Sequence, residues 1–558
     1  MPDLMLPLAP SPSPTLPTVQ RPTPAAALLQ WIDAHRYLLF ALLLLAWILA
    51  FSGQWRLGND STLYVSLARN LAAGHGYHAV GWPRGNSHIG LPLMLSWTFR
   101  LFGPAALWPM LTLIFLMGIA ALACTYRLLL FVIPRPNAVA AALLTGVSFT
   151  FTEYLYELLN EVPAFLGMIA ALAAFEALAG PRSAHAHRSR WPWAILLIAG
   201  LALATALRPA TWALMLAMAA VLLARALRHP PLRKTALVVV SLIALALLAT
   251  WLLDPRHGHM DESHQQMIRK LLIEQPGQTL RTLWSTTLLQ IFGPMTTRTV
   301  FTTGLGPGFS TLAALAILAL TLNAARRRPL WLLWVAGTIL MLLLYPFPQT
   351  RYYLPILPFI ALGLLDAALW LGQKTGPRAA AMALLLALWI LPSAARLARL
   401  AWLQHQPHFL AGVINGRYLP YARMDHAIDA SLPPDALILS DDALALEALA
   451  PASDSRRFMM PMNIPPPDLL PQLPKLLDHR LLFAVDTGNG ALDQSLQLLQ
   501  LTVGPPLATI DRPAWDYPHA PERWFHRTPI AQPPPLVLRA LLPLAASSAA
   551  SQESTTRP

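Results

Sequence analysis

Long apolar blocks recur along most of the first 400 residues and alternate with short polar connections. A helix needs about 20 mostly apolar residues to cross a bilayer, and these blocks approach that length. The pattern therefore predicts an α-helical polytopic membrane protein. We expect about eleven spans, near residues 37–52, 107–122, 138–151, 162–178, 193–206, 211–223, 236–253, 309–322, 331–344, 354–371 and 379–391.

The connections between the apolar blocks alternate in charge. Lys and Arg collect in the cytoplasmic loops of membrane proteins. The connections that follow the even-numbered spans are basic and contain no carboxylates, so they are expected to face the cytoplasm; they are 127–135, 182–190, 225–234, 326–328 and 374–378. An odd number of spans then places the C-terminal region on the external side.

The opposite ends of the spans have a different character, because carboxylates, isolated arginines and aromatic residues gather there. Ionisable residues at the edge of a membrane bundle are candidates for a functional site. They comprise Asp60 in the first external loop (53–105), Glu153, Glu157, Glu161, Arg208, the polar insert 254–298 and the segment YPFPQTRYY at 345–353.

The composition supports the membrane class and excludes one kind of partner. Hydrophobic residues make up 55% of the 558 positions and charged residues only 12%, whereas soluble chains carry roughly a quarter charged residues. The net charge of +13 comes mainly from the clusters between spans, and the sequence has no basic stripe with interleaved aromatic residues. Nucleic acid is therefore excluded as a partner.

Proline-rich segments and shifts in composition divide the chain into four parts. Residues 1–30 are predicted to form a disordered cytoplasmic tail, and residues 31–400 the transmembrane domain. Within residues 401–530, DALILSDDALALEALA (435–450) reads as a strand and a helix and RLLFAVDTG (480–488) as a strand. This pattern predicts a small extracytoplasmic α/β domain, followed by a disordered tail at 531–558.

Asp60 has two interpretations that are compatible with each other. It precedes STLYVSLARNLAAG, so it could cap a helix that Gly74 ends. It could also be a catalytic carboxylate held at the membrane surface. The helix places Leu63, Leu67 and Tyr64 on one face and polar side chains on the other, which is typical of a helix in the membrane interface.

Three further ionisable residues also have a structural and a functional interpretation. Glu161 is either a first-turn acid that interacts favourably with the helix dipole or a second functional carboxylate that orients substrate or a cation. Glu157, one turn earlier, could substitute for it. Arg208 and Arg351 either anchor their spans in the interface or clamp a phosphate, whose oxygens suit a planar guanidinium group.

Histidines raise the question of a metal site. His75, His78 and His88 share the first external loop with Asp60. Their spacing matches no standard metal-binding pattern, so ordinary loop histidines are favoured, and the alternative of a divalent metal stays open. The insert DPRHGHMDESHQQMIRKLL (254–272) mixes histidines with acids and has the same two interpretations.

Taken together, the motifs resemble a known family. NDSTLYVSLARNLAAGHGYH (59–78), followed by HIGLPLMLSWTFRLFG (88–103), is similar to the first external loop of GT-C glycosyltransferases, especially the protein O-mannosyltransferase and aminoarabinose-transferase group (family 39-like, Rgt-type). HIGLPL departs from the PPGYPL-like segment that is usual there. Further motifs of the group are similar to NEVPAF (160–165), ALRPA (206–210) and RYYLPILPF (351–359), in the same order.

The resemblance implies a GT-C-like fold and a membrane glycosyltransferase whose donor is a sugar linked to a polyprenyl phosphate. It implies Asp60 as the general base and Glu161 as a second catalytic carboxylate, with inversion at the anomeric carbon. No cofactor is implied apart from the lipid-linked donor. The substrate-binding candidates are Tyr64, Arg208, Arg351, Tyr352, Tyr353 and His88.

The implied partners are membrane lipids, the lipid-linked sugar donor and an extracytoplasmic acceptor, which could be a glycan, a lipid or a protein. The Ala-, Leu-, Pro- and Arg-rich composition is typical of a GC-rich bacterium. We therefore expect the protein to lie in the inner membrane, with the active site on its periplasmic face.

Two alternative functions stay open: a non-catalytic transporter, and a membrane protein that binds a lipid-linked sugar without transferring it. Transporters usually contain internal repeats and place polar groups near the bilayer midplane; this sequence shows no convincing repeat.

Overall fold

The computed structural model describes most of the helical region and parts of the C-terminal region. The described residues are 23–53, 55, 59–79, 88–103, 106–179, 191–208, 210–228, isolated positions between 233 and 277, 306–344, 350–373, 376–404, 415–433, 436–440, 446–447, 458–459, 482–486, 496, 501–511 and 535–543. Statements about the structure refer to these residues.

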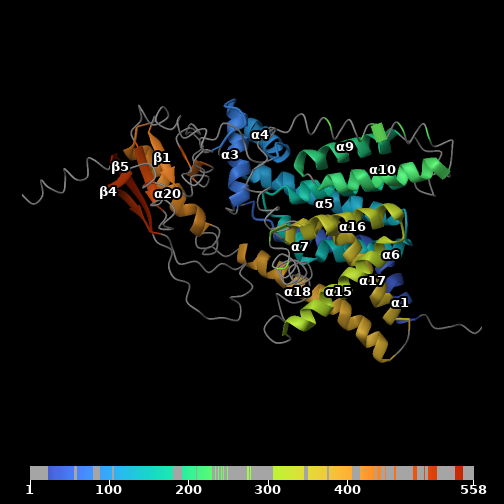
Figure 1. Ribbon diagram of the computed structural model, residues 1–558. Helices are drawn as coiled ribbons and strands as arrows, with labels where there is room; N and C mark the ends of the chain where they lie inside the picture. The colour runs from blue at the N-terminus through green and yellow to red at the C-terminus, as the bar shows by residue number, and fades with distance from the viewer. Residues whose placement is uncertain are drawn as a thin grey trace, which may run out of the picture.

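The helical region is a bundle in which α8 is surrounded by its neighbours. Helices α5, α8, α9 and α10 lie side by side, while α3 and α4 lie at one end of the bundle (Figure 1). The helices are α1 (Pro24–Ala34), α2 (Arg36–Leu49), α3 (Asn59–Ala73), α4 (Gly90–Phe102), α5 (Trp108–Leu130), α6 (Arg135–Val147), α7 (Phe149–Tyr154), α8 (Glu161–Ala179), α9 (Trp191–Leu207), α10 (Thr211–Arg228), α15 (Gly306–Ala325), α16 (Pro329–Leu344), the 3₁₀ helix η5 (Thr350–Ile356), α17 (Leu357–Leu371) and α18 (Pro377–Gln404).

Several of these helices have the length and composition of membrane spans, in agreement with the predicted class. Within the described part of the chain five qualify, in α5, α8, α10, the continuous segment Arg351–Leu371 and α18, and the bent pair of α1 and α2 would be a sixth. The predicted span at 236–253 lies outside the described residues apart from isolated positions. The number of eleven spans therefore stays a prediction.

Helix α8 is the centre of the bundle because its sequence, EVPAFLGMIAALAAFEALA, is apolar on every side. A helix of that kind is stable only where other helices cover it, and its residues from 161 to 176 are almost all buried. Two glycines allow α9 to approach closely: a Cβ placed on Gly167 would lie 2.7 Å from the carbonyl oxygen of Gly200, and the reverse holds as well. The close crossing fixes the end of α9 relative to the start of α8.

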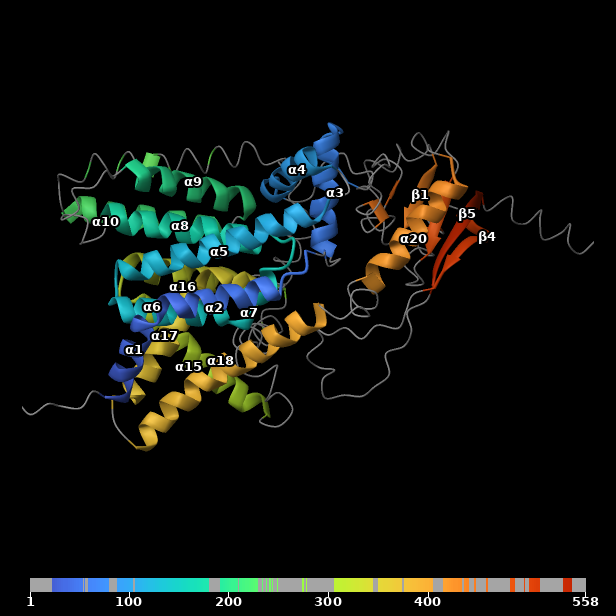
Figure 2. The ribbon, with the colours of Figure 1, turned by 180° about the vertical axis from the view of Figure 1, so that it is seen from behind.

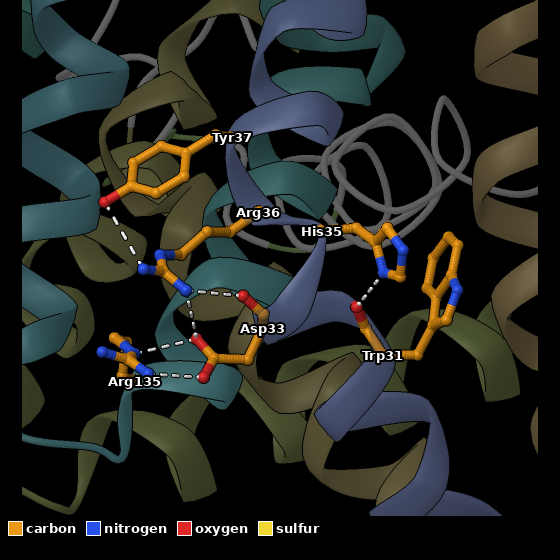
Figure 3. Close-up of polar contacts among 6 residues, drawn as sticks. All are labelled: Trp31, Asp33, His35, Arg36, Tyr37 and Arg135. Atoms are coloured by element: carbon orange, nitrogen blue, oxygen red, sulfur yellow. Dashed lines mark hydrogen bonds and ion pairs between the residues drawn. The ribbon is translucent and has the colours of Figure 1, made fainter.

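The opposite end of the bundle contains the bend between α1 and α2. The two helices meet at His35 at an angle of 71°. Figure 3 shows the contacts around the bend: Arg135, at the start of α6, donates to both carboxylate oxygens of Asp33 at 2.8 and 2.7 Å, and Arg36 donates to the Asp33 carbonyl oxygen at 2.8 Å. These contacts tie α1 to α6 and leave α1 pointing away from the axis of α2.

The C-terminal region contains a five-stranded mixed sheet with the strand order β2-β1-β3-β5-β4. Strand β1 is parallel to β2 and β3, while β5 is antiparallel to β3 and β4. Helix α20 (Asn415–Ser431) packs on β4 and β5. The strands are β1 (Leu437–Ser440), β2 (Phe458–Met459), β3 (Leu482–Asp486), β4 (Leu501–Ile510) and β5 (Leu536–Pro543).

The structure contains a secondary-structure element inside each of the two predicted tails. Strand β5 lies within the predicted tail 531–558. A strand forms there because the sequence LVLRALLP is largely apolar and pairs with strands on both sides. At the N-terminus α1 begins at Pro24, inside the predicted tail 1–30, and Thr23 caps it by accepting a hydrogen bond from the Ala26 N–H at 3.3 Å. The remainder of both tails lies outside the described residues.

Helix α3 lies between the end of the bundle and the C-terminal sheet in both views (Figures 1 and 2). Its polar residues Thr62, Ser66 and Asn70 are buried, and the Asn70 amide donates to Glu447 Oε1 at 2.9 Å. The C-terminal region therefore supplies a buried acceptor to the polar face of α3. That the apolar face of this helix lies in the membrane interface stays a prediction.

Candidate active site

Asp60 is held at the start of α3. The helix begins at Asn59, so Asp60 lies in its first turn rather than at the capping position that precedes a helix, and Gly74 ends the helix with a φ of +81°. A buried hydrogen bond of 3.1 Å from Trp55 Nε1 to Ser61 Oγ fixes the chain on either side of Asp60. The Asp60 side chain remains 45% exposed, so a substrate can reach it.

Arg351 joins two carboxylates that are far apart in the sequence. It is a residue of η5, and its guanidinium group forms an ion pair with Asp60 Oδ2 through Nη2. Its Nε lies 3.1 Å from Glu161 Oε1. Glu161 is the first residue of α8 and is only 3% exposed. The predicted general base and the predicted second carboxylate therefore share one cation.

Arg208 completes the cluster. It follows the last residue of α9, and its Nη2 pairs with the same oxygen of Glu161 that faces Arg351. Asp60, Glu161, Arg208 and Arg351 thus form a connected set of two acids and two guanidinium groups, which is formally neutral. We call it the charge tetrad. Four residues that the sequence singled out separately are brought together by α3, α8, α9 and η5.

The two tyrosines after Arg351 have different surroundings. The ring of Tyr352 faces both cations of the tetrad: the guanidinium carbon lies 4.5 Å from the ring centroid for Arg208 and 5.3 Å for Arg351. Such contacts stabilise a cation over an aromatic face. Tyr353 is 1% exposed and belongs to the buried core. Of the pair, Tyr352 therefore borders the tetrad and Tyr353 packs inside the bundle.

Tyr64 and Asn160 form the edge of the site next to Glu161. The Asn160 amide donates to the Tyr64 hydroxyl at 3.0 Å. Burial, followed by the negative charges of Glu161 and Asp60, raises the pKa of Tyr64, so its hydroxyl keeps its proton at neutral pH. Asn160 precedes Glu161 in the NEVPAF motif, but no feature of the sequence marked it as a functional residue.

His88 lies just before α4 and is half-buried. Helix α4 begins against the end of α9, where Gly90 meets the backbone of Ala206 without room for a side chain. Ala206 is two positions before Arg208, so this contact brings the start of α4, next to His88, close to the Arg208 backbone. Substrate binding by His88 stays a prediction.

The described residues include no group of three or more His, Cys, Asp or Glu side chains that could hold a metal ion. The predicted mixed His and acid segment at 254–272 lies outside the described part of the chain. In the tetrad, two guanidinium groups already occupy the carboxylates and oppose the approach of a further cation. The arrangement of these side chains does not fit a metal.

Comparison with known proteins gives the fold. No protein-family model matches the chain, and no curated protein sequence matches it. Two crystal structures of ArnT from Cupriavidus metallidurans are similar: the apo form at a TM-score of 0.51 and 14% identity, and the form bound to undecaprenyl phosphate at 0.50 and 15%. Each match covers 92% of this chain and 98% of ArnT.

A third similar structure is the archaeal oligosaccharyltransferase AglB from Archaeoglobus fulgidus, in complex with an inhibitory peptide and a dolichol-phosphate. It matches at a TM-score of 0.45 and 13% identity, over 82% of this chain and 70% of AglB. The ArnT matches span nearly the whole length of both chains. They confirm the predicted likeness to GT-C glycosyltransferases at the level of the fold.

Proposed function

We propose that this protein is a membrane glycosyltransferase that moves a hexose or pentose from a polyprenyl-phosphate-linked donor to an extracytoplasmic glycan, lipid or protein. The observation that carries the proposal is the charge tetrad: a half-exposed carboxylate, Asp60, bound to a buried guanidinium group, Arg351, at one end of a bundle with the ArnT fold. One ArnT structure holds undecaprenyl phosphate, which supports a polyprenyl phosphate as the carrier.

The reaction we propose is a single displacement at the anomeric carbon. The acceptor hydroxyl oxygen forms a bond to that carbon, the bond from the carbon to the phosphate oxygen breaks, and the configuration inverts. The hydroxyl proton goes to Asp60, and the electron pair of the broken bond stays on the phosphate. General base catalysis of this kind contributes typically ~10²–10⁴-fold.

The arginines stabilise the charge that develops on the leaving phosphate. Arg351 and Arg208 present two guanidinium groups over the face of Tyr352, and a fixed cation is most effective where negative charge develops in the transition state. A phosphate that binds Arg351 competes with Asp60 for its Nη2 group. Donor binding therefore releases the Asp60 carboxylate, which is then free to accept the proton of the acceptor.

The remaining features fit the same scheme. We propose that Glu161 holds both arginines in place, that Tyr64 and His88 border the substrate, and that the basic connections face the cytoplasm of a bacterium. The C-terminal sheet then lies on the external side of the inner membrane as an α/β domain, after eleven spans. We propose that Tyr353, which is 1% exposed, packs in the core and does not contact the substrate.

Transfer assays with the full-length protein in membranes test the proposal. Radiolabelled glucose, mannose, galactose and arabinose on polyprenyl phosphate are supplied in turn with membrane extract as the source of acceptor. The expected result is labelled product from at least one donor. Binding of a donor without transfer by the wild-type protein would instead support the alternative of a non-catalytic binding protein or transporter.

A further inference from the structure

Two buried acceptor oxygens beside the tetrad lack a hydrogen-bond partner among the described residues. They are Oδ1 of Asn160 and Oε2 of Glu161, on consecutive residues that are 4% and 3% exposed. Buried polar side-chain atoms in proteins are nearly always paired, so an unpaired one needs an explanation. Here two of them belong to consecutive residues at the candidate active site.

The protein itself holds both side chains in a fixed orientation. Glu161 directs its other oxygen, Oε1, to Arg208 and Arg351. Asn160 uses its amide nitrogen to donate to the Tyr64 hydroxyl at 3.0 Å. Each side chain is thus held through one polar atom, and its remaining oxygen is left to accept a hydrogen bond. This is the arrangement expected of a preorganised site for a ligand that carries donors.

The position of the tetrad indicates which part of a ligand would lie next to the two unpaired oxygens. The guanidinium groups that would hold the donor phosphate also bind Glu161, so the unpaired oxygens lie next to the phosphate position. The part of a glycosyl phosphate nearest to its phosphate is the sugar ring around the anomeric carbon, with hydroxyl groups on the following carbons. Hydrogen bonds to the 2-hydroxyl strengthen as oxocarbenium character develops in glycosyl transfer.

We propose that Asn160 Oδ1 and Glu161 Oε2 accept hydrogen bonds from two neighbouring ring hydroxyls of the donor sugar, those at carbons 2 and 3. The inference rests on the proposed function and adds a specificity determinant to it. The site then selects sugars with both hydroxyls over 2-deoxy and 3-deoxy sugars. A site built to bind a substrate hydroxyl strongly rejects the analogue that lacks it, since the buried acceptor is then left unpaired.

Binding measurements on the full-length protein in lipid nanodiscs test this specificity. The probes are polyprenyl phosphate alone and the same lipid carrying glucose, mannose or arabinose, each with its 2-deoxy and 3-deoxy analogues. For at least one sugar, the wild-type protein is expected to bind the complete donor at least about 10-fold more tightly than either deoxy donor. In Asn160→Leu the preference at one of the two carbons is expected to fall below about threefold.

Two further variants separate recognition from folding. Asn160→Asp keeps an acceptor oxygen and is expected to keep the preference. Glu161→Gln is expected to lose the preference at the other carbon, because its single oxygen stays with the arginines and an amide NH₂ group, which cannot accept a hydrogen bond, takes the place of Oε2. A purely structural role for these residues would weaken the binding of all probes equally and leave the ratios unchanged. That result would overturn the proposal.

The outcomes also separate this inference from the proposed function. Equal affinity of the wild-type protein for complete and deoxy donors would overturn the inference even where sugar transfer is observed. Discrimination without transfer would uphold the recognition site and contradict the glycosyltransferase. If Mg²⁺ or Mn²⁺ alone binds the wild-type protein and not Asn160→Leu, the two oxygens are cation ligands and the inference is wrong.

Discussion

Asp60 and Arg351 are 291 positions apart in the sequence and form an ion pair at the end of the helical bundle. The carboxylate comes from the first turn of α3, and the guanidinium group from the 3₁₀ helix that precedes α17. The Arg351 side chain is 13% exposed and the Asp60 side chain 45%. The pair therefore joins a buried cation to a carboxylate that substrates can reach. The proposed reaction requires both: a cation that faces the leaving phosphate and a base that the acceptor can reach.

Replacement of Arg351 by Ala is expected to weaken binding of a polyprenyl-phosphate donor by at least about 30-fold. Truncation of a buried, hydrogen-bonded charge typically costs about 2–5 kcal/mol, and 30-fold corresponds to the lower value. Arg351→Lys is expected to restore only part of the affinity, because an ammonium group cannot form the planar two-oxygen contact. Binding isotherms at constant ionic strength measure both effects.

A matched control for Arg351 is available in another Arg–Asp pair. Arg327 Nη1 lies 2.7 Å from Asp366 Oδ2, and this pair connects the turn after α15 to the far half of α17. Arg327→Ala is expected to leave donor affinity within about threefold of wild type. Ion pairs at the protein surface contribute only about 0–1 kcal/mol to stability, and this pair lies away from the tetrad. Equal losses in the two variants would show that Arg351 does not contact the donor.

The contact between Asn70 and Glu447 is expected to stabilise the attachment of the C-terminal region to α3. Both residues are buried, and hydrogen bonds to charged groups contribute about 1.5–3 kcal/mol. Asn70→Ala and Glu447→Ala should each lower the midpoint of thermal unfolding. In the double variant the loss should be smaller than the sum of the two, because the two changes remove one shared interaction.

The control for this cycle is Asp366→Ala, which lies in the far half of α17. Its effect should add to that of Asn70→Ala within about 0.3–0.5 kcal/mol, as expected for distant sites. Additivity of Asn70→Ala and Glu447→Ala themselves would mean that the two side chains do not interact in solution.

Gly167→Ala is expected to destabilise the protein by about 1–3 kcal/mol, because the added Cβ would collide with the backbone of α9 at Gly200. Gly337 offers a matched control in the middle of α16, where a Cβ would meet only Ala213 Cβ at an ordinary 3.7 Å. Gly337→Ala is expected to be neutral or to stabilise the helix by about 0.5–1 kcal/mol. Thermal unfolding of the two purified variants distinguishes them, and equal stability would contradict the close crossing of α8 and α9.

The sequence predicted the helical class and singled out the four charged residues of the tetrad, and missed the contacts between them. Asp60, Glu161, Arg208 and Arg351 are recognisable because charged residues at the ends of apolar segments are rare and stand out in the sequence. The pairing of Arg351 with both acids depends on how α3, α8 and η5 meet in space. No local pattern of residues contains that information, so the tetrad emerged only from the fold.

The burial of the polar face of α3 and the formation of β5 were both missed for the same physical reason. A polar helix face that contains Thr62, Ser66 and Asn70 has the same sequence pattern whether water or a polar protein surface covers it. Similarly, the short apolar run 536–543 becomes a strand because β3 and β4 lie on either side of it. In both cases a distant segment of the chain determines the environment, and local periodicity cannot report it.

Comparison of Asp60→Asn with the wild-type protein tests the central claim most directly. Asparagine keeps the size of the side chain and removes its ability to accept a proton as a base. In single-turnover assays with a donor that the wild-type protein uses, the rate of sugar transfer is expected to fall by ~10²–10⁴-fold. Donor affinity should be retained or increased, since Arg351 loses its competing carboxylate. Transfer at the wild-type rate by a folded, donor-binding Asp60→Asn variant would contradict the account.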